Sequence, residues 1–291
     1  RFELPTLILK PGSEASIPID VRTEPLTDSM MREPTVHATI QYTTESERSQ
    51  DITHQRNVPI DLEGLEAVAS AAENNRVLAL PNKSAVRIAS DESINDLSTF
   101  TLECWMKGRP AGDRVALVTR TENSSFGLFL RDNNRSHPGG YVHIQGHGYV
   151  NVAMNHDPDW SKWHHVALVY DGEKLRLFVD GRVASQTECS GAITPNDMPL
   201  YVGADPDPRG KPMSFFSGRI DEVRLSSTAR YEQPFTPRRV LARDGETVLL
   251  LHFDRTAAGL HPDESGHGHH GWPVGTPTLK SSDKSPASST N

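Results

Sequence analysis

A glycine- and histidine-rich segment near the C-terminus, residues 263–271, holds the side chains with the most evident chemistry. Its three histidines, His267, His269 and His270, are of the residue type that binds zinc. No cysteine stands beside them, and histidines in a glycine-rich loop are more often exposed to solvent than bound to a metal. We therefore expect loop histidines here rather than a zinc site.

Acidic residues could support glycoside hydrolysis, which requires two carboxyl groups at a fixed separation. Asp221 and Glu222 are adjacent in a strand-like segment, so we expect their side chains to point to opposite faces. The motifs of serine hydrolases, zinc peptidases and phosphate-binding loops do not occur in the sequence. The sequence therefore predicts a protein that is not an enzyme, and a glucanase-type hydrolase is the least favoured alternative.

Aromatic and polar residues in the middle of the chain could form a carbohydrate site, because sugar rings stack on aromatic faces while their hydroxyls need hydrogen-bond partners. Two predicted strands, residues 141–145 and 149–154, alternate apolar and polar residues. The other interpretation is that these rings complete an edge of the core with their polar tips in water. The candidate ligand-binding residues are Tyr141, His143, Tyr149, Asn151, Trp160 and Trp272.

These residues need a scaffold, and residues 163–185 give the strongest signal for one. Two Asp-Gly pairs, at 171–172 and 180–181, separate runs of β-favouring residues. Asp-Gly is a preferred pair for a two-residue hairpin, since both turn positions accept positive φ. We therefore expect three antiparallel strands in a meander. Residues 166–170 are apolar on both faces, which predicts a strand covered on each side.

The same segment resembles the central signature of the laminin-G-like, concanavalin A-like jelly-roll family. The matching residues are Trp-His-His-Val-Ala at 163–167, Tyr-Asp-Gly at 170–172 and Val-Asp-Gly at 179–181. Further similarities follow in chain order, at 100–107, at 216–225 and in the loop 263–271. The resemblance covers about residues 75 to 275 and implies an all-β fold, an antiparallel jelly-roll β-sandwich. It says less about function, because one fold hosts many functions.

The position of the glycine-rich loop departs from the family pattern. In many relatives this loop follows the first strand, whereas here it follows residues 249–253 near the C-terminus. The ends of a sandwich domain are commonly close together, so either end of the chain can supply the same edge strand. We expect this arrangement, with the C-terminal segment folded back beside residues 220–225. The alternative is a second, truncated repeat that begins at Leu249.

The resemblance also implies a structural calcium ion (Ca2+) that ties this loop to the closing strand. Calcium binds six to eight oxygens from carboxylates and backbone carbonyls. Glycines at 266, 268 and 271 let the loop curl so that its carbonyls converge. The other interpretation is that these are ordinary turn residues at strand ends. The residues proposed for the metal are Asp221, Asp263, Asp254 and His270, the last through its carbonyl oxygen.

The remaining segments suggest a module within a longer polypeptide. Residues 1–66 are predicted to form a small β unit, of the kind found as part of an immunoglobulin-like sandwich. Residues 67–74 are a predicted linker, 75–279 the laminin-G-like jelly roll, and 280–291 a disordered tail. No signal peptide opens the sequence at Arg1, so we expect a processed or excised fragment. Cys104 and Cys189 are expected as thiols, with a disulfide as the alternative.

Charge and hydropathy narrow the class of partner. The net charge of −8 argues against nucleic acid, which needs a basic face. The longest apolar runs are only as long as a strand, which argues against membrane insertion. We expect a non-catalytic binding module of a secreted, periplasmic or cell-surface multidomain protein, whose partners are a polysaccharide or glycoprotein and the neighbouring domains. The alternative is a structural spacer or protein-interaction domain that binds no sugar.

Overall fold

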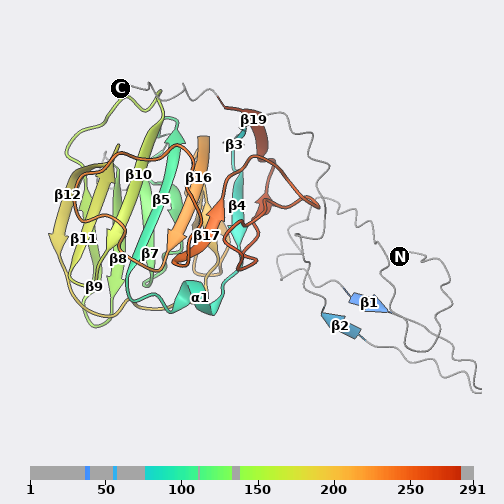
Figure 1. The fold of residues 1–291 in the computed structure, drawn as a ribbon, viewed down its shortest axis with the longest axis horizontal. Helices are drawn as coiled ribbons and strands as arrows, with labels where there is room; N and C mark the ends of the chain where they lie inside the picture. Colours follow the sequence, from blue (N-terminus) through green and yellow to red (C-terminus); the bar gives the residue numbers. More distant parts are fainter. Residues whose placement is uncertain (1–36, 40–54, 58–75, 111, 133–137, 283–291) are drawn as a thin grey trace, which may run out of the picture.

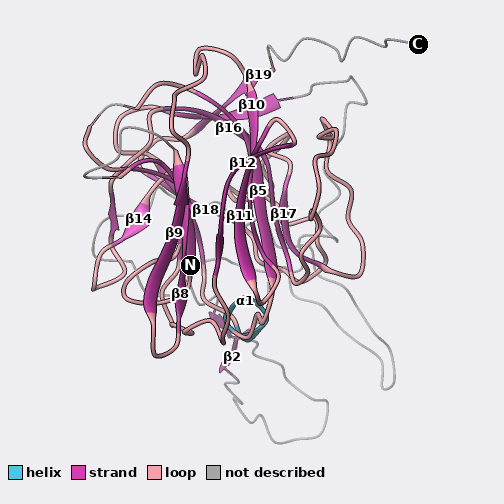
Figure 2. Cartoon of the chain, turned by 90° about the vertical axis from the view of Figure 1, so that its left-hand side faces the viewer, coloured by secondary structure: helices cyan, strands magenta, loops and turns pink. Residues whose placement is uncertain are grey.

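The computed structural model describes residues 37–39, 55–57, 76–110, 112–132 and 138–282 of the 291-residue chain. Within these residues two antiparallel sheets face each other as a sandwich, and the one helix is the short α1 (Glu92–Asn95) (Figures 1 and 2). The expected all-β antiparallel sandwich is confirmed. Most of the predicted N-terminal β unit, the linker 67–74 and most of the tail 280–291 lie outside the described residues, apart from a short pair of strands, β1 (His37–Thr39) and β2 (Gln55–Asn57).

The larger sheet has eight strands. In spatial order these are β12 (Arg182–Glu188), β11 (Lys174–Val179), β10 (His164–Tyr170), β5 (Phe100–Lys107), β16 (Gly218–Ser226), β3 (Arg76–Leu80) and β19 (Thr278–Ser281), with β17 (Thr247–Leu251) also paired to β16.

The second sheet has seven strands, and a short hairpin adjoins it. In spatial order the strands are β18 (Trp272–Val274), β4 (Ala85–Ile88), β13 (Leu200–Val202), β6 (Val115–Thr119), β7 (Phe126–Arg131), β8 (Gly139–Ile144) and β9 (Gly148–Ala153). The hairpin pairs β14 (Asp205–Pro206) with β15 (Pro212–Met213).

The core lies between the two sheets and follows from the period-two alternation of the strands. Leu102 of β5, Leu168 of β10 and Val142 of β8 all point into it and are fully buried. The sheets approach so closely at Gly140 that a Cβ there would lie 2.4 Å from Cδ1 of Leu168. This close approach explains why the second residue of β8, which faces the core, is a glycine.

The predicted meander forms β10, β11 and β12, but its two turns differ. Asp180 and Gly181 both have positive φ (50° and 72°) and make the expected two-residue turn between β11 and β12. The first turn is longer than predicted, because Tyr170 pairs with Leu175. The carboxylate of Asp171 accepts hydrogen bonds from the backbone N–H groups of Glu173 and Lys174, and this side-chain-to-backbone turn replaces the tight hairpin.

A crossing segment covers the outer face of the eight-stranded sheet. We call residues 227–246, which follow β16, the strap; in Figure 1 it is the orange trace that crosses the face of this sheet. Tyr231 and Phe235 of the strap pack on Ala167, Val169 and Phe178. The prediction that residues 166–170 are covered on both faces is therefore confirmed.

The C-terminal segment completes both sheets. Strand β17 pairs with β16, so that Leu249 lies opposite Leu225 and Leu251 opposite Val223. Strand β19 then pairs with β3, and β18 pairs with β4. The segment after Leu249 belongs to this sandwich and does not begin another repeat. Cys104 and Cys189 form no disulfide, and no helix among the described residues is long and apolar enough to cross a membrane.

Candidate functional site

A pocket of about 300 Å³ lies against strands β6 to β9 and the connections beside them. We call it the β6–β9 pocket. It combines aromatic rings with charged and uncharged hydrogen-bonding groups, a mixture suited to a polar ligand with apolar ring faces. The described residues that line it are Arg114, Thr121, Glu122, Asn123, Asp132, Tyr141 and Tyr149.

The aromatic part of the pocket comes from the neighbouring strands β8 and β9. Register places Tyr149 opposite His143 and Asn151 opposite Tyr141. The rings of Tyr141 and Tyr149 meet edge to face with centroids 5.8 Å apart, and His143 lies perpendicular to Tyr149 at 4.8 Å. Tyr149 remains 40% exposed, so one side of its ring is open to a ligand. Burial raises the pKa of Tyr149, and the backbone N–H groups of the turn at 122–124 partly offset this.

The charged part of the pocket is built around Arg114. Its guanidinium lies 4.7 Å from the ring centroid of Phe129, and its Nη2 atom is 2.8 Å from Oδ2 of Asp205. Its Nε atom is 3.5 Å from Oδ1 of Asp132, whose other oxygen accepts a hydrogen bond from Tyr141. Asp205 is fully buried and also accepts hydrogen bonds from the hydroxyls of Thr119 and Thr121. These contacts fix the orientation of every charged group along this wall.

The turn between β6 and β7 forms another wall and is held in an unusual conformation. Asn123 and Ser125 both have positive φ (53° and 56°), a region that residues other than glycine rarely adopt. Ser125 donates its N–H to Thr194 O at 2.7 Å, and the Asn196 amide donates to Arg120 O and to Ser124 Oγ. Backbone strain of this kind persists only where surrounding contacts fix it, and it is frequent at binding sites.

The structure brings four of the six sequence-predicted ligand residues together, namely Tyr141, His143, Tyr149 and Asn151. Trp160 is a correction: it is only 5% exposed, packs edge-on against His164 and belongs to the main core. Its indole N–H donates to Asp157 at 3.2 Å, so burial leaves no polar atom of the ring unpaired.

Trp272 lies too far away to share this site. It belongs to β18, at the opposite edge of the seven-stranded sheet from β9. Three strand spacings, about 14 Å, separate β18 from β6, the nearest strand of the pocket, and Trp272 is not among the described lining residues. The residues that sequence reasoning missed, Arg114, Thr121, Glu122, Asn123 and Asp132, come from strand ends and turns that carry no fixed spacing. Only the turn-type composition of residues 121–125 hints at them.

The proposed metal residues lie around the glycine-rich loop, where Asp263 acts as an organiser of the backbone. Its Oδ1 atom accepts from the N–H groups of Leu250 and Ser265, both at 2.9 Å. Its Oδ2 atom accepts from Ser265 Oγ at 2.6 Å and from His269 N at 2.9 Å. A carboxylate offers about four lone-pair positions, so donors of this chain already occupy those of Asp263.

The other proposed metal residues do not add to a calcium-type oxygen cage. Asp254 is exposed and accepts a hydrogen bond from Arg76 N, while Nδ1 of His270 accepts from Asp263 N. Asp221 is buried within β16. No group of three or more His, Cys, Asp or Glu side chains in the described part of the chain is arranged to hold a metal ion. These side chains are thus engaged in contacts within the chain, and the calcium that the resemblance implies, bound partly through loop carbonyls, stays a prediction.

The two acids considered for catalysis are neighbours at a kink in β16. Glu222 has a φ of 54°, and the ladder between β16 and β5 is interrupted between Asp221 and Arg224. The Glu222 carboxylate contacts His252 Nδ1 at 3.0 Å and accepts the N–H of Leu241 at 2.7 Å. Glu222 is therefore engaged in holding the strap and β17 in place.

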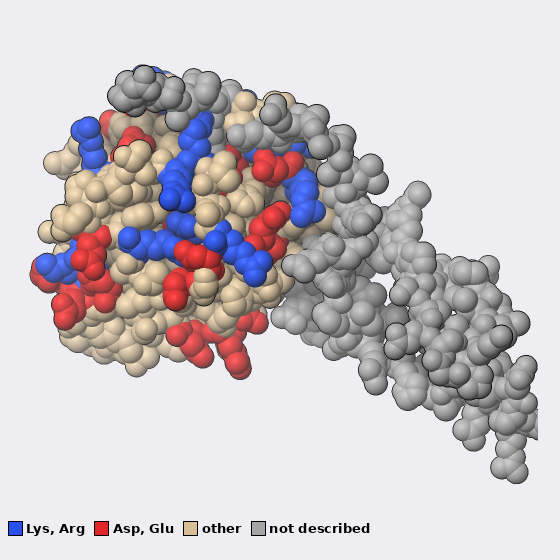
Figure 3. Space-filling model, in the orientation of Figure 1, with Lys and Arg blue, Asp and Glu red and all other residues tan. Residues whose placement is uncertain are grey.

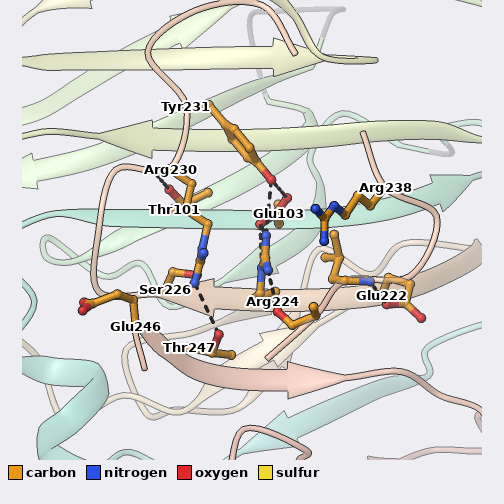
Figure 4. A network of polar contacts seen from close by, with 12 residues as sticks. Thr101, Glu103, Glu222, Arg224, Ser226, Arg230, Tyr231, Arg238, Glu246 and Thr247 are labelled. Carbon is orange, nitrogen blue, oxygen red and sulfur yellow. Dashed lines mark hydrogen bonds and ion pairs between the residues drawn. The ribbon is translucent and has the colours of Figure 1, made fainter. Parts of the chain in front are cut away.

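A buried polar network lies under the strap (Figure 4). Glu103 accepts hydrogen bonds from Arg224 at 2.6 and 2.8 Å and from Tyr231 at 2.9 Å, and it contacts His165 at 3.0 Å. Burial acts to raise the pKa of Glu103, but the hydrogen bond with His165 and the charge of Arg224 bring it below its ordinary value. Because the side chain of Glu103 has no solvent exposure, this network secures the strap and offers no ligand site.

Two further surface features of the described residues are a second hollow and a face that carries both acidic and basic side chains. The hollow is wide and polar, and its described lining residues are Ser90, Asp91, Glu92, Ser93, Asn95 and Asp197, with no aromatic ring among them. Figure 3 shows the face crossed by the strap, where Lys and Arg side chains gather over the middle with Asp and Glu among and below them. Neither feature resembles a built ligand site.

The chain belongs to the concanavalin A-like lectin/glucanases superfamily. A laminin-G-type model of this superfamily matches residues 80–233, more than half of the chain. The match spans the meander, strands β4 to β16 and the whole β6–β9 pocket. The resemblance stated from the sequence is confirmed.

Individual relatives are distant. Human laminin subunit alpha-3 is 36% identical over 74 residues, which are 24% of this chain and 2% of that protein. The crystal structure of a candidate carbohydrate binding protein from Bacteroides ovatus is 21% identical with a TM-score of 0.59, covering 73% of this chain and 61% of that one. A heptameric pentraxin from Limulus polyphemus is 13% identical with a TM-score of 0.40, covering 54% of this chain and 78% of that one. This chain thus spans only part of the first two relatives.

Proposed function

We propose that this protein is a non-catalytic carbohydrate-binding module and that the β6–β9 pocket is its binding site. The observation that carries the proposal is the exposed ring of Tyr149 beside polar groups of fixed orientation. A sugar ring stacks on the open face of Tyr149, and its hydroxyls bond to Thr121, Asn123 and the two carboxylates. Superfamily membership and the similarity to the Bacteroides ovatus protein support this class of ligand.

The walls of the pocket are preorganised, which favours affinity for a small flexible ligand. Arg114 is held by Asp205, and the turn at Asn123 is held by Asn196 and Thr194. Binding therefore orders few protein groups, so little conformational entropy is lost at the site. The bound sugar is the end or an accessible unit of a polysaccharide or glycoprotein chain outside the cell, presented to neighbouring domains of the same polypeptide.

Calcium is not part of the proposed binding mechanism. The calcium site stays a prediction from the family resemblance, and the contacts of Asp263 argue against it. Hydrolysis is not part of it either: Glu122 and Asp132 serve as hydrogen-bond acceptors for the ligand. Asp132 is already engaged by Tyr141 and Arg114, which suits a fixed acceptor better than a group that forms a covalent bond to sugar.

Isothermal titration calorimetry with a panel of neutral and charged oligosaccharides tests the proposal. Tyr149→Ala removes the exposed ring and should weaken binding by roughly threefold to tenfold. Val183→Ala is the matched control, because Val183 is 38% exposed against 40% for Tyr149 and stands on β12 of the other sheet, outside the pocket lining. No binding to any sugar favours the spacer alternative. Equal binding by wild type and Tyr149→Ala places the site elsewhere, and release of reducing ends would establish hydrolysis.

A further inference from the structure

The charges around the β6–β9 pocket indicate which class of sugar it accepts. Two carboxylates, Glu122 and Asp132, and one guanidinium, Arg114, belong to its described lining. Arg114 is already paired with Asp205 at 2.8 Å, and Asp205 is fully buried. The lining therefore carries two carboxylates and one guanidinium that a third, buried carboxylate already pairs, so the balance of charge that a ligand meets is negative.

The position of Arg114 strengthens this imbalance. One of its nitrogens faces the buried Asp205, another lies 3.5 Å from Asp132, and its Cζ atom lies over the ring of Phe129. An acidic ligand would have to displace one of these partners to form a bidentate pair with Arg114. Glu122 has no such cation at hydrogen-bond distance among the described residues.

The environment of Glu122 is consistent with a negative potential. Burial raises the pKa of its carboxyl group and the negative charges of Asp205 and Asp207 raise it further, while the positive charge of Arg114 offsets only part of this rise. A group of like charge placed in the pocket would meet the same repulsion. A cation placed there relieves it.

We propose that the pocket selects sugars that carry a free amine, of the glucosamine type, and disfavours uronic, sialic and sulfated sugars. This inference rests on the proposed function and specifies the ligand of that same site. The protonated amine donates charge-assisted hydrogen bonds to Glu122 and Asp132. The face of Tyr149 adds a cation–π attraction, since its ring forms part of the same pocket.

Calorimetry with three matched oligomers at about pH 6.5 tests the inference: a glucosamine trimer, its N-acetylated form, which lacks the charge, and a trimer of a uronic acid. Glu122→Gln and Asp132→Asn keep the shape of each side chain and remove its charge. The control is Glu173→Gln, at an exposed acid in the turn before β11. Circular dichroism melting curves establish that each variant is folded.

We expect the glucosamine trimer to bind most tightly and the uronic acid trimer least tightly. Each charge-removing variant should weaken binding of the glucosamine trimer by about fivefold and leave binding of the N-acetylated trimer within about twofold. The control variant should match the wild type. Equal binding of the neutral and amine-bearing trimers, unchanged in the variants, overturns the amine preference and leaves the proposed function standing. Failure of all three trimers and of every neutral oligosaccharide overturns both.

Discussion

The guanidinium of Arg114 lies 2.8 Å from a carboxylate oxygen of Asp205, a residue with no solvent exposure. Arg114 immediately precedes β6 and Asp205 begins β14, so this ion pair joins two segments separated along the chain. The hydroxyls of Thr119 and Thr121 bond to the other oxygen of Asp205. The pair thus anchors the wall of the β6–β9 pocket to the hairpin β14–β15.

Replacing Arg114 should destabilise the protein through the charge left behind. Arg114→Met keeps the apolar stem over Phe129 but leaves Asp205 buried without its cation, so we expect a loss of about 3 kcal/mol in the free energy of unfolding. The double variant Arg114→Met, Asp205→Asn should recover most of this loss, because no charge then remains buried. Urea denaturation of the wild type, Arg114→Met, Asp205→Asn and the double variant measures the coupling energy between Arg114 and Asp205. Additive effects of the two substitutions would contradict this prediction.

Glu103 should be essential for holding the strap. Glu103→Gln removes the counter-ion of the buried Arg224 and the charge that accepts the Tyr231 hydroxyl. We expect a loss of about 3 kcal/mol and increased proteolysis within residues 227–246. Glu246→Gln, at an exposed acid of the strap, should change the free energy of unfolding by less than about 1 kcal/mol. Equal protease resistance of both variants would show that the network does not secure the strap.

The glycine-rich loop should depend on Asp263 rather than on calcium. Asp263→Ala leaves the N–H groups of Leu250 and Ser265 without their acceptor, which should cost about 3 kcal/mol. Asp254→Ala, which loses one exposed hydrogen bond, should cost less than about 1 kcal/mol. The melting temperature of the wild type should be the same in calcium and in chelator. A calcium-dependent rise that Asp263→Ala abolishes would establish the metal site instead.

The pair His164–Asp180 should confer a pH dependence on stability. Burial acts to lower the pKa of His164, but the 2.7 Å contact with the Asp180 carboxylate raises it above its ordinary value. Burial acts to raise the pKa of Asp180, and the hydrogen bond with His164 brings it below its ordinary value. The His164 contribution is therefore complete below about pH 6.5 and lost as pH rises through the folded pKa. The Asp180 contribution is present above about pH 4 and lost as pH falls through the folded pKa.

The stabilisation should therefore be greatest between about pH 4 and 6.5, and the wild type should lose about 1 kcal/mol between about pH 6 and 8.5. The expected loss of stability is small because Asp180 is half exposed, so solvent screens the pair. His164→Gln should lack this part of the pH dependence, and His156→Gln, at an exposed histidine, should retain it. Chemical denaturation across the range measures it, and parallel curves for wild type and His164→Gln would refute the assignment.

Local patterns in the sequence predict the scaffold well. The Asp180–Gly181 turn depends on only two residues, so it can be predicted without knowledge of the fold. The two-sided burial of residues 166–170 also follows from composition alone. The length of the turn at Asp171 cannot be predicted in this way. The side chain of Asp171 accepts hydrogen bonds from the backbone N–H groups of Glu173 and Lys174, and this contact favours a longer turn over a tight hairpin.

The sequence predicts only those pocket residues that lie on regular strands. Tyr141 and Tyr149 lie on the outward face of adjacent strands, and alternation identifies both. Arg114, Glu122 and Asp132 stand in separate connections, and only the assembled sheet brings them together. The prediction of Trp160 as a ligand residue is wrong. It stands alone in a loop, where no periodic pattern distinguishes a buried ring from an exposed one.

Backbone amide NMR spectra recorded during titration with an oligosaccharide test the central claim most directly, because they locate the ligand without any substitution. The account predicts chemical-shift changes concentrated at residues 121–125, Tyr141 and Tyr149, with little change in the strap or around Asp91 and Asp197. Changes concentrated around Asp91 and Asp197, or no changes with any sugar in the panel, would contradict it.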